Sequence, residues 1–166
     1  MFDNLTAGDI KKMEEELEHR KLVIRPAAIA DVKEARAQGD LSENFEYYAA
    51  KKYKNENESR IRYLEKMIKT ANIIEDTSKD NEVGINNTVT VYFEEDDCEE
   101  TYKIVTSIRG DILKGLITME SPLAKAVMGH KENERVEVKV NDSVSYYVVI
   151  KKIDKTTDED EEIRKF

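Results

Sequence analysis

The residues of this chain best suited to chemistry form a short acidic cluster. Asp40, Glu43 and Glu46 follow one another at intervals of three, with Ser42 and Asn44 between them. A single turn of carboxylates is by itself weak evidence of a functional site. Acidic residues also suit a first helical turn, with Asp40 as the cap and Glu43 three positions on. Spacing alone leaves both interpretations open.

Two long helical patterns flank the cluster. Residues recur at intervals of three and four, the spacing of a coiled-coil seam. The expected inward positions are Ile10, Met13, Leu17, Arg20, Ile24, Ala28, Val32 and Ala35 going out, and Phe45, Ala49, Tyr53, Asn57, Ile61, Leu64, Ile68 and Ala71 coming back. Facing pairs such as Met13 with Ile68 and Leu17 with Leu64 have numbers that add to 81. The pattern predicts an antiparallel hairpin that turns at Gly39 and Asp40.

The first helix has a marked start and an interruption. Thr6 can cap it with Asp9 three residues on, and Leu5 can pack on Ile10. Pro26 removes a backbone donor within the helical pattern, so we expect a kink or a local break there.

A second domain follows the hairpin, which we assign to residues 1–76. Residues 77–87 lose the helical period and gather Ser, Asn, Asp and Gly, which favours a linker. We expect the second domain over residues 88–154. Residues 155–166 form an acidic tail that is too polar to pack and is expected to be mobile.

The second domain has the period of β-strands. Val89, Val91 and Phe93 alternate with polar residues, and a second strand follows an acidic turn. Ser121 before Pro122 and Gly129 beyond mark a short helix, and two more strands are expected over 134–140 and 144–153. The fold class is therefore an α-helical coiled-coil hairpin followed by a small α+β domain, an antiparallel sheet with one short helix.

Bulk composition excludes several classes. The net charge is −9, no apolar run approaches a membrane span, and the first residues lack a signal peptide, so we expect a cytoplasmic protein with no membrane partner. Residues 1–76 carry 16 acidic and 14 basic side chains and residues 77–166 carry 20 and 13, so stable binding to free DNA is not expected. The single Cys98 excludes an internal disulfide. We expect a monomer.

The run over residues 35–51, A-R-A-Q-G-D-L-S-E-N-F-E-Y-Y-A-A-K, resembles the tip signature of the Gre family, bacterial transcript-cleavage factors. Similarity continues at residues 89–91, 114–117 and 121–126. The resemblance implies that the hairpin enters the secondary channel of bacterial RNA polymerase. It also implies that Asp40 and Glu43 help hold a second Mg²⁺ and its hydrolytic water for cleavage of the RNA 3′ end in backtracked complexes. The polymerase supplies the first metal, so the chain is not expected to be an enzyme by itself.

The resemblance assigns further roles. Ser42 and Asn44 either orient water and carboxylates or shape the turn, and Glu46 and Tyr47 support the tip. Arg36 is a candidate for contact with the nascent RNA. The other RNA-contacting candidate is Lys52, and the polymerase-docking candidates are Leu116, Ile117, Ser121 and Pro122. The resemblance also implies an FKBP-like second domain, in which Leu116 fits a core position equally well.

Two other functions remain open. A channel-binding regulator of the same shape would modulate the polymerase without cleavage, although retention of Asp40 and Glu43 argues against it. A prolyl isomerase or a hairpin chaperone follows from fold analogy, but the second domain has no Trp and few aromatic residues for a proline pocket.

Overall fold

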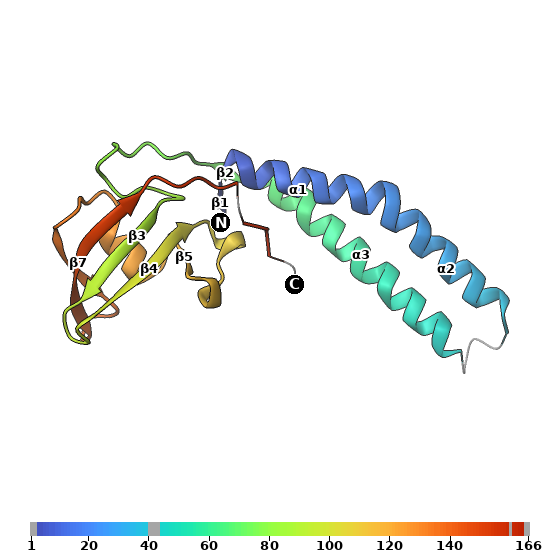
Figure 1. The fold of residues 1–166 in the computed structure, drawn as a ribbon. Helices are drawn as coiled ribbons and strands as arrows, with labels where there is room; N and C mark the ends of the chain where they lie inside the picture. The colour runs from blue at the N-terminus through green and yellow to red at the C-terminus, as the bar shows by residue number, and fades with distance from the viewer. Residues whose placement is uncertain (1–2, 40–43, 160, 165–166) are drawn as a thin grey trace. The chain divides into compact units, whose positions relative to one another are not determined.

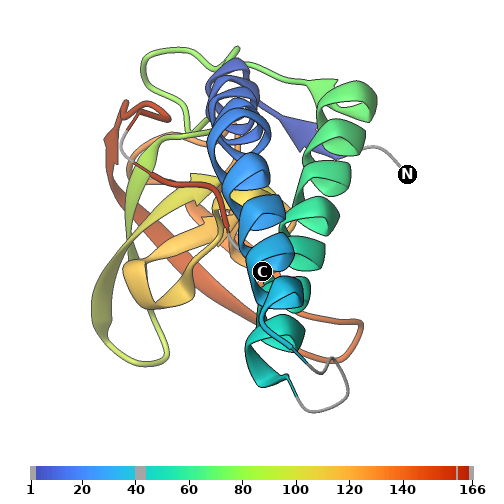
Figure 2. The ribbon, with the colours of Figure 1, turned by 90° about the vertical axis from the view of Figure 1, so that its right-hand side faces the viewer.

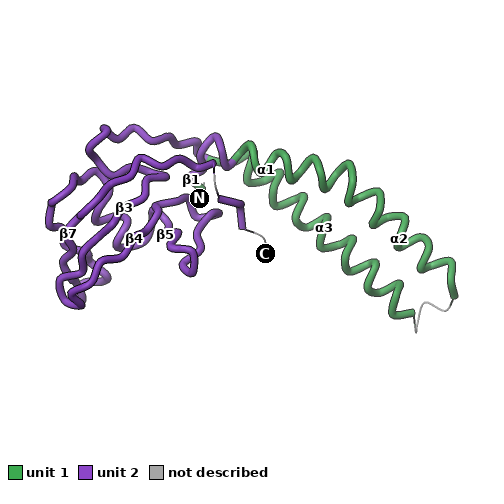
Figure 3. Tube along the Cα trace, in the orientation of Figure 1, with its two compact units in different colours: residues 1–3, 10–71 green, residues 4–9, 72–166 purple. Residues whose placement is uncertain are grey.

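A computed structural model describes residues 3–39, 44–159 and 161–164. The chain forms two compact units, coloured separately in Figure 3: Met1–Asp3 with Ile10–Ala71, and Asn4–Asp9 with Asn72–Phe166. The first unit is a helical hairpin and the second is a sheet domain, as predicted.

The hairpin consists of helices that run out and back. The outgoing arm comprises α1 (Ala7–His19), η1 (Arg20–Ile24) and α2 (Arg25–Ala37), and the return is α3 (Phe45–Thr70). Figures 1 and 2 both show α2 and α3 running side by side. The first turn of α1 belongs to the sheet unit and is closed by the predicted capping box. In this box, Thr6 N donates to Asp9 Oδ2 at 3.0 Å and Asp9 N donates to Thr6 Oγ1 at 3.2 Å.

The interruption predicted at Pro26 is confirmed. The five residues of η1 form a π-helical segment, in which Arg25 N–H donates to Arg20 O five residues back. Pro26 lies in the first turn of α2, directly after this segment. The π-helical segment η1 thus immediately precedes the helical turn that contains the proline.

The outgoing arm and the inner part of the return arm agree with the predicted seam. Met13, Ala28 and Ala35 are buried on the outgoing arm, and Ile61 and Leu64 are buried on α3. The other outgoing positions of the predicted seam are partly buried. The 3-4 spacing therefore identified the contact face correctly there.

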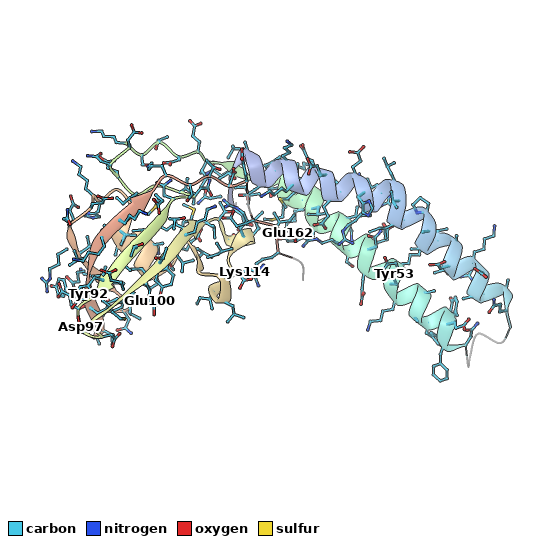
Figure 4. The ribbon with its side chains drawn as sticks, in the orientation of Figure 1. Tyr53, Tyr92, Asp97, Glu100, Lys114 and Glu162 are labelled. Atoms are coloured by element: carbon cyan, nitrogen blue, oxygen red, sulfur yellow. The ribbon has the colours of Figure 1, made fainter. Side chains whose placement is uncertain are left out.

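The outer part of the return seam was predicted wrongly. Phe45 is 86% exposed, Tyr53 is 52% exposed and projects outward from α3 in Figure 4, and Ala49 is exposed. Tyr47 and Ala50 take the inward positions instead. Three successive steps of four residues, at about 100° per residue, carry Phe45 roughly 120° around the helix from Asn57.

Polar residues join the two arms where aliphatic residues are missing. Glu16 Oε2 accepts from Arg60 Nε at 2.8 Å and from Arg20 Nε at 2.7 Å, and Arg20 also donates to Asn57 Oδ1 at 2.9 Å. Burial alone raises the pKa of Glu16, but the hydrogen bonds and charges of Arg60 and Arg20 outweigh it, so the pKa lies below its ordinary value. The Arg60 side chain is only 4% exposed. Glu16 is thus a charge-balancing residue inside the hairpin.

Glu16→Gln is expected to destabilise the hairpin by about 2 kcal/mol, because Arg60 loses a charged acceptor inside the seam. Denaturant unfolding followed by circular dichroism measures this. Glu65→Gln is the matched control, since Glu65 pairs with Lys21 at the surface, and its cost should stay under about 1 kcal/mol. The pKa of Glu16 is depressed, so its contribution should be present at neutral pH and disappear as the pH falls through the lowered pKa. Equal costs for the two variants would contradict the assignment.

The second unit is built on a mixed sheet. Its strands are β3 (Thr88–Phe93), β4 (Cys98–Val105), β5 (Leu116–Thr118), β6 (Arg135–Lys139) and β7 (Ser145–Asp154), in the spatial order β5-β4-β3-β7-β6. A separate short parallel pair joins β1 (Asn4–Leu5) to β2 (Asn72–Ile73). The helix α4 (Pro122–Val127) contributes Leu123, Ala124 and Val127 to the core with Val89 and Val91 of β3. The strands and the short helix agree with the predicted α+β domain.

One strand pairing corrects the expectation of an antiparallel sheet. The edge strand β5 runs parallel to β4. The connection between them contains two short 3₁₀ segments, η2 (Ser107–Arg109) and η3 (Ile112–Lys114), and is too long for a tight hairpin. Gly115 closes η3 with φ of 73°, and its carbonyl accepts from Lys103 N at 2.9 Å.

Residues 77–87 and the tail do not behave as predicted. Val83 and Ile85 lie in the core of the sheet domain, so the segment expected to be a linker is part of that domain. In the tail, the side chain of Ile163 is 8% exposed, and Arg164 N donates to Ile108 O at 2.6 Å. Isolated aliphatic residues among polar ones gave no periodic signal, yet each is buried.

Candidate functional site

The acidic residues Asp40 and Glu43, with Ser42, lie outside the described residues. The structure describes the helix ends on either side of them. Gly39 has φ of 142°, a backbone conformation that residues with a side chain rarely adopt, in agreement with a turn at this point. The returning helix begins only at Phe45, and its cap is Asn44, so the interpretation of Asp40 as the cap of this helix is wrong.

Asn44 joins the two helix ends. Its Oδ1 accepts from Tyr47 N at 3.0 Å, which caps α3, and its Nδ2 donates to Ala35 O at 2.7 Å, near the end of α2. Both ends of the amide are therefore used within the hairpin. Of the two roles open for Asn44, the structure supports shaping of the turn.

Arg36 and Tyr47 form a second link between the arms. Tyr47 is 9% exposed, and the guanidinium carbon of Arg36 lies 5.7 Å from the centre of its ring. A hydrogen bond with Arg36 is the largest influence on the Tyr47 hydroxyl and lowers its pKa below the ordinary value. Arg36 thus supports the tip through Tyr47, a role that the sequence did not reveal.

Lys52 and Glu46 lie on the open face of α3. The Lys52 side chain is 79% exposed, and its ammonium is 4.0 Å from Glu56, at the limit of an ion pair. Its charge therefore remains accessible to solvent. Glu46 is exposed in the first turn of α3, where its charge favours the helix dipole.

The candidate docking residues divide into two groups. Ile117 is a core residue and Ser121 Oγ accepts from Ala124 N at 3.3 Å as the cap of α4, so both serve the fold. Leu116 is partly buried and Pro122 is exposed.

Sequence reasoning missed an exposed apolar pair in the sheet domain. Ile112 and Leu113 on η3 are 80% and 95% exposed. They are held by Asp111, whose side chain accepts from Leu113 N and whose backbone exchanges two 2.9 Å hydrogen bonds with Leu116. An apolar pair between Asp111 and Gly115 was the available signal. The two neighbouring side chains form a small apolar patch on the surface of the sheet domain.

Two absences hold for the described part of the chain. Residues 3–39, 44–159 and 161–164 contain no cluster of three His, Cys, Asp or Glu side chains that could hold a metal ion. Among the helices described, none combines the length and the apolar character needed to cross a membrane.

Comparison with known families decides the assignment. A family model described as "Transcription elongation factor, N-terminal" matches residues 4–73, and a second, "Transcription elongation factor, GreA/GreB, C-term", matches residues 78–155. The chain belongs to the GreA/GreB family of transcription elongation factors. The match spans both the hairpin and the sheet domain of this GreA/GreB member, and it ends before residue 156.

Named relatives agree with the family. The chain is 42% identical over 150 residues to transcription elongation factor GreA of Mesoplasma florum, covering 90% of this chain and 96% of the relative. It is 44% identical over 134 residues to GreA of Bacillus subtilis, covering 81% and 85%. A solved structure of GreA factor homolog 1 of Thermus thermophilus aligns over 92% of this chain and 99% of its own, with 21% identity and a TM-score of 0.43.

Asn44→Ala is expected to cost about 1 kcal/mol of helix stability in this GreA/GreB member and to raise hydrogen exchange at the Tyr47 amide, because the cap of α3 is lost. Asn44→Asp separates the two roles, since aspartate still accepts from Tyr47 N but cannot donate to Ala35 O. Unchanged exchange in Asn44→Ala would contradict the capping role.

Proposed function

We propose that this protein stimulates cleavage of the RNA 3′ end by bacterial RNA polymerase in backtracked complexes, with its hairpin inserted in the secondary channel. The observation that carries the proposal is the acidic tip sequence, set between helix ends that are tied together by Asn44 and by the Arg36–Tyr47 contact. The GreA relatives support a role in elongation. The proposal places the protein in the cytoplasm, as a monomer.

Asp40 and Glu43 fit a partial Mg²⁺ site because both supply oxygen ligands, and the surrounding sequence, residues 35–51, contains no His or Cys. When bound, the shared Mg²⁺ activates a water and stabilises the leaving oxygen of a phosphodiester. The two carboxylates of this chain hold and orient the ion. Neither residue cleaves RNA by itself, so the protein acts only together with the polymerase.

Two basic residues beside the tip, Lys52 and Arg36, are the candidates for contact with the RNA. The accessible ammonium of Lys52 can bind a phosphate of the extruded 3′ end as a point charge. Arg36 is exposed but contacts Tyr47, so its first role is to position the tip.

Docking on the polymerase is assigned to the sheet domain. Pro122 and the partly buried Leu116 remain from the sequence candidates. The exposed Ile112 and Leu113 add apolar area beside Leu116. Burial of these apolar side chains against the partner removes apolar surface from water, which favours binding.

The proposal is tested with a stalled, backtracked elongation complex from the same source, in the presence of Mg²⁺. The wild-type protein is expected to accelerate shortening of the RNA 3′ end over the rate without added factor. Binding to the polymerase without any acceleration would overturn cleavage and favour the non-cleaving channel regulator.

A further inference from the structure

The tail beyond residue 155 lies along the sheet domain through a series of specific contacts. Thr156 Oγ1 donates to Asn86 O at 2.7 Å, and the carbonyl of Thr157 accepts from Lys103 Nζ. Thr156 and Thr157 lie beyond residue 155, where the match to the family model ends. The described part of the tail thus lies outside the matched region, yet it contacts the sheet domain.

Glu161 provides the main polar contact of the tail. Its Oε1 lies 2.5 Å from Lys103 Nζ and 3.7 Å from Arg109 Nη1, and its side chain is only 8% exposed. Arg109 is itself fully buried and donates from Nε to Asp9 Oδ1 at 2.6 Å. The acidic and basic side chains thus alternate in the order Asp9, Arg109, Glu161, Lys103. The tail supplies one of the two acids, Glu161.

Ile163 and the backbone of Arg164 provide the remaining contacts. Ile163 is 8% exposed, and Arg164 N donates to Ile108 O at 2.6 Å. Tail residues 161–164 and the segment around η3, including Lys114 and Leu116, line one cleft; Figure 4 labels Lys114 and Glu162. One buried acid, one aliphatic side chain and one backbone hydrogen bond together have the form of a short peptide in its binding site.

Gly8 leaves room for a further contact of the tail, made by Asp158. Thr6 Oγ1 donates to Asp158 Oδ2 at 2.6 Å, and a Cβ atom on Gly8 would lie 2.2 Å from the same oxygen. The Asp158 carboxylate therefore reaches the first turn of α1 only because residue 8 has no side chain. Its charge also suits the N-terminus of that helix.

We propose that Lys103, Arg109 and the backbone carbonyl of Ile108 form a binding groove for an acidic peptide with a following aliphatic residue, and that the described tail residues 158–159 and 161–164 are its displaceable ligand. The basic side chains select the acid, and the cleft that Leu116 lines beside Ile163 accepts the aliphatic residue. Release of the tail exposes this groove beside Ile112 and Leu113. The proposal goes beyond the proposed function and does not depend on it.

Hydrogen exchange of the full chain tests whether the tail is bound through this charge pair. Glu161→Lys is expected to reduce protection of the Arg164 amide by about tenfold or more, and Lys103→Glu should do the same. The double variant Lys103→Glu/Glu161→Lys restores one pair of opposite charges but places a second cation beside Arg109, so it should regain part of the protection. Glu162→Lys, at an exposed neighbour, is the matched control and should change nothing. Loss of protection in the double variant equal to that in the single variants would overturn the charge pairing.

A labelled peptide with the tail sequence tests whether the groove accepts a ligand from outside. The variant Glu161→Lys/Ile163→Asp should bind it at least about tenfold more tightly than the wild type, because the tethered tail competes at a high effective concentration. A peptide carrying the same two changes should not bind. No binding to the opened variant overturns the proposal. Loss of protection at the core amide of Ile150 in that variant also overturns it, because the tail would then be an inseparable part of the fold.

Gly8→Ala gives an independent check. Alanine normally favours a helix over glycine, yet here it is expected to raise exchange in the tail, because its Cβ displaces Asp158. Adding Asp158→Ala should remove this difference. Unchanged exchange of the tail in Gly8→Ala would contradict the placement of Asp158.

Discussion

Replacing Asp40 by Asn and Glu43 by Gln in one variant is expected to reduce stimulated RNA cleavage by about 100-fold or more, the order of loss seen when a group that stabilises a transition state is removed. Both changes keep the size of the side chain and remove its charge. Neutral amides bind Mg²⁺ more weakly than carboxylates, so the shared ion and its water would no longer be held. Cleavage of a backtracked complex under saturating factor measures the effect.

Two controls separate chemistry from binding. The double variant should still compete with the wild-type protein for the polymerase, because the docking candidates lie in the sheet domain. Glu46→Gln should change cleavage by only a few-fold, since Glu46 is exposed in the first turn of α3 and serves mainly the helix dipole. Full cleavage by the double variant would mean that Asp40 and Glu43 are not the metal ligands.

The hairpin shows how far periodicity alone can predict a structure. Met13, Ile61 and Leu64 were placed correctly because large apolar residues at 3-4 spacing have only one face to bury. Towards the tip the sequence offers Tyr and Ala in several registers, and hydrogen bonds decide among them. The bonds of Asn44 and the Arg36–Tyr47 contact fix Tyr47 inward. These residues can be seen in the sequence, but the sequence does not predict which of them pair across the turn.

The sheet domain was predictable in its elements but not in its long-range polar contacts. Alternation predicted β3, and the Ser-Pro start predicted α4, since both are local signals. Asp9 was correctly identified in the capping box, but nothing local indicates that Arg109, a hundred positions away, donates to the same carboxylate. Polar residues such as Glu161 are predicted to be solvated unless their partners are known. For this reason the tail was predicted to be too polar to pack, although Glu161 and Ile163 are largely buried.

Asp9→Ala is expected to be the most destabilising single change in the sheet unit, at about 3 to 5 kcal/mol. The Asp9 carboxylate is fully buried and accepts from Arg109 Nε at 2.6 Å, from Thr106 Oγ1 at 2.7 Å and from Thr6 N at 3.0 Å. Its removal leaves the buried charge of Arg109 without its closest acid. Denaturant unfolding monitored through the exchange of core amides in β7 measures the loss.

A double-mutant cycle shows whether Asp9→Ala destabilises the protein by leaving the Arg109 charge unpaired or by removing packing contacts. Arg109→Met removes the base and keeps most of its aliphatic volume, so the pair Asp9→Ala/Arg109→Met should cost clearly less than the two single changes added together. Removing one partner of a buried ion pair leaves the other charge uncompensated, whereas removing both partners leaves no buried charge. Additive costs would mean that Asp9 acts chiefly through the capping box and Thr106. A coupling of several kcal/mol would identify the Asp9–Arg109 pair as the contact that fixes the first turn of α1 to the sheet unit.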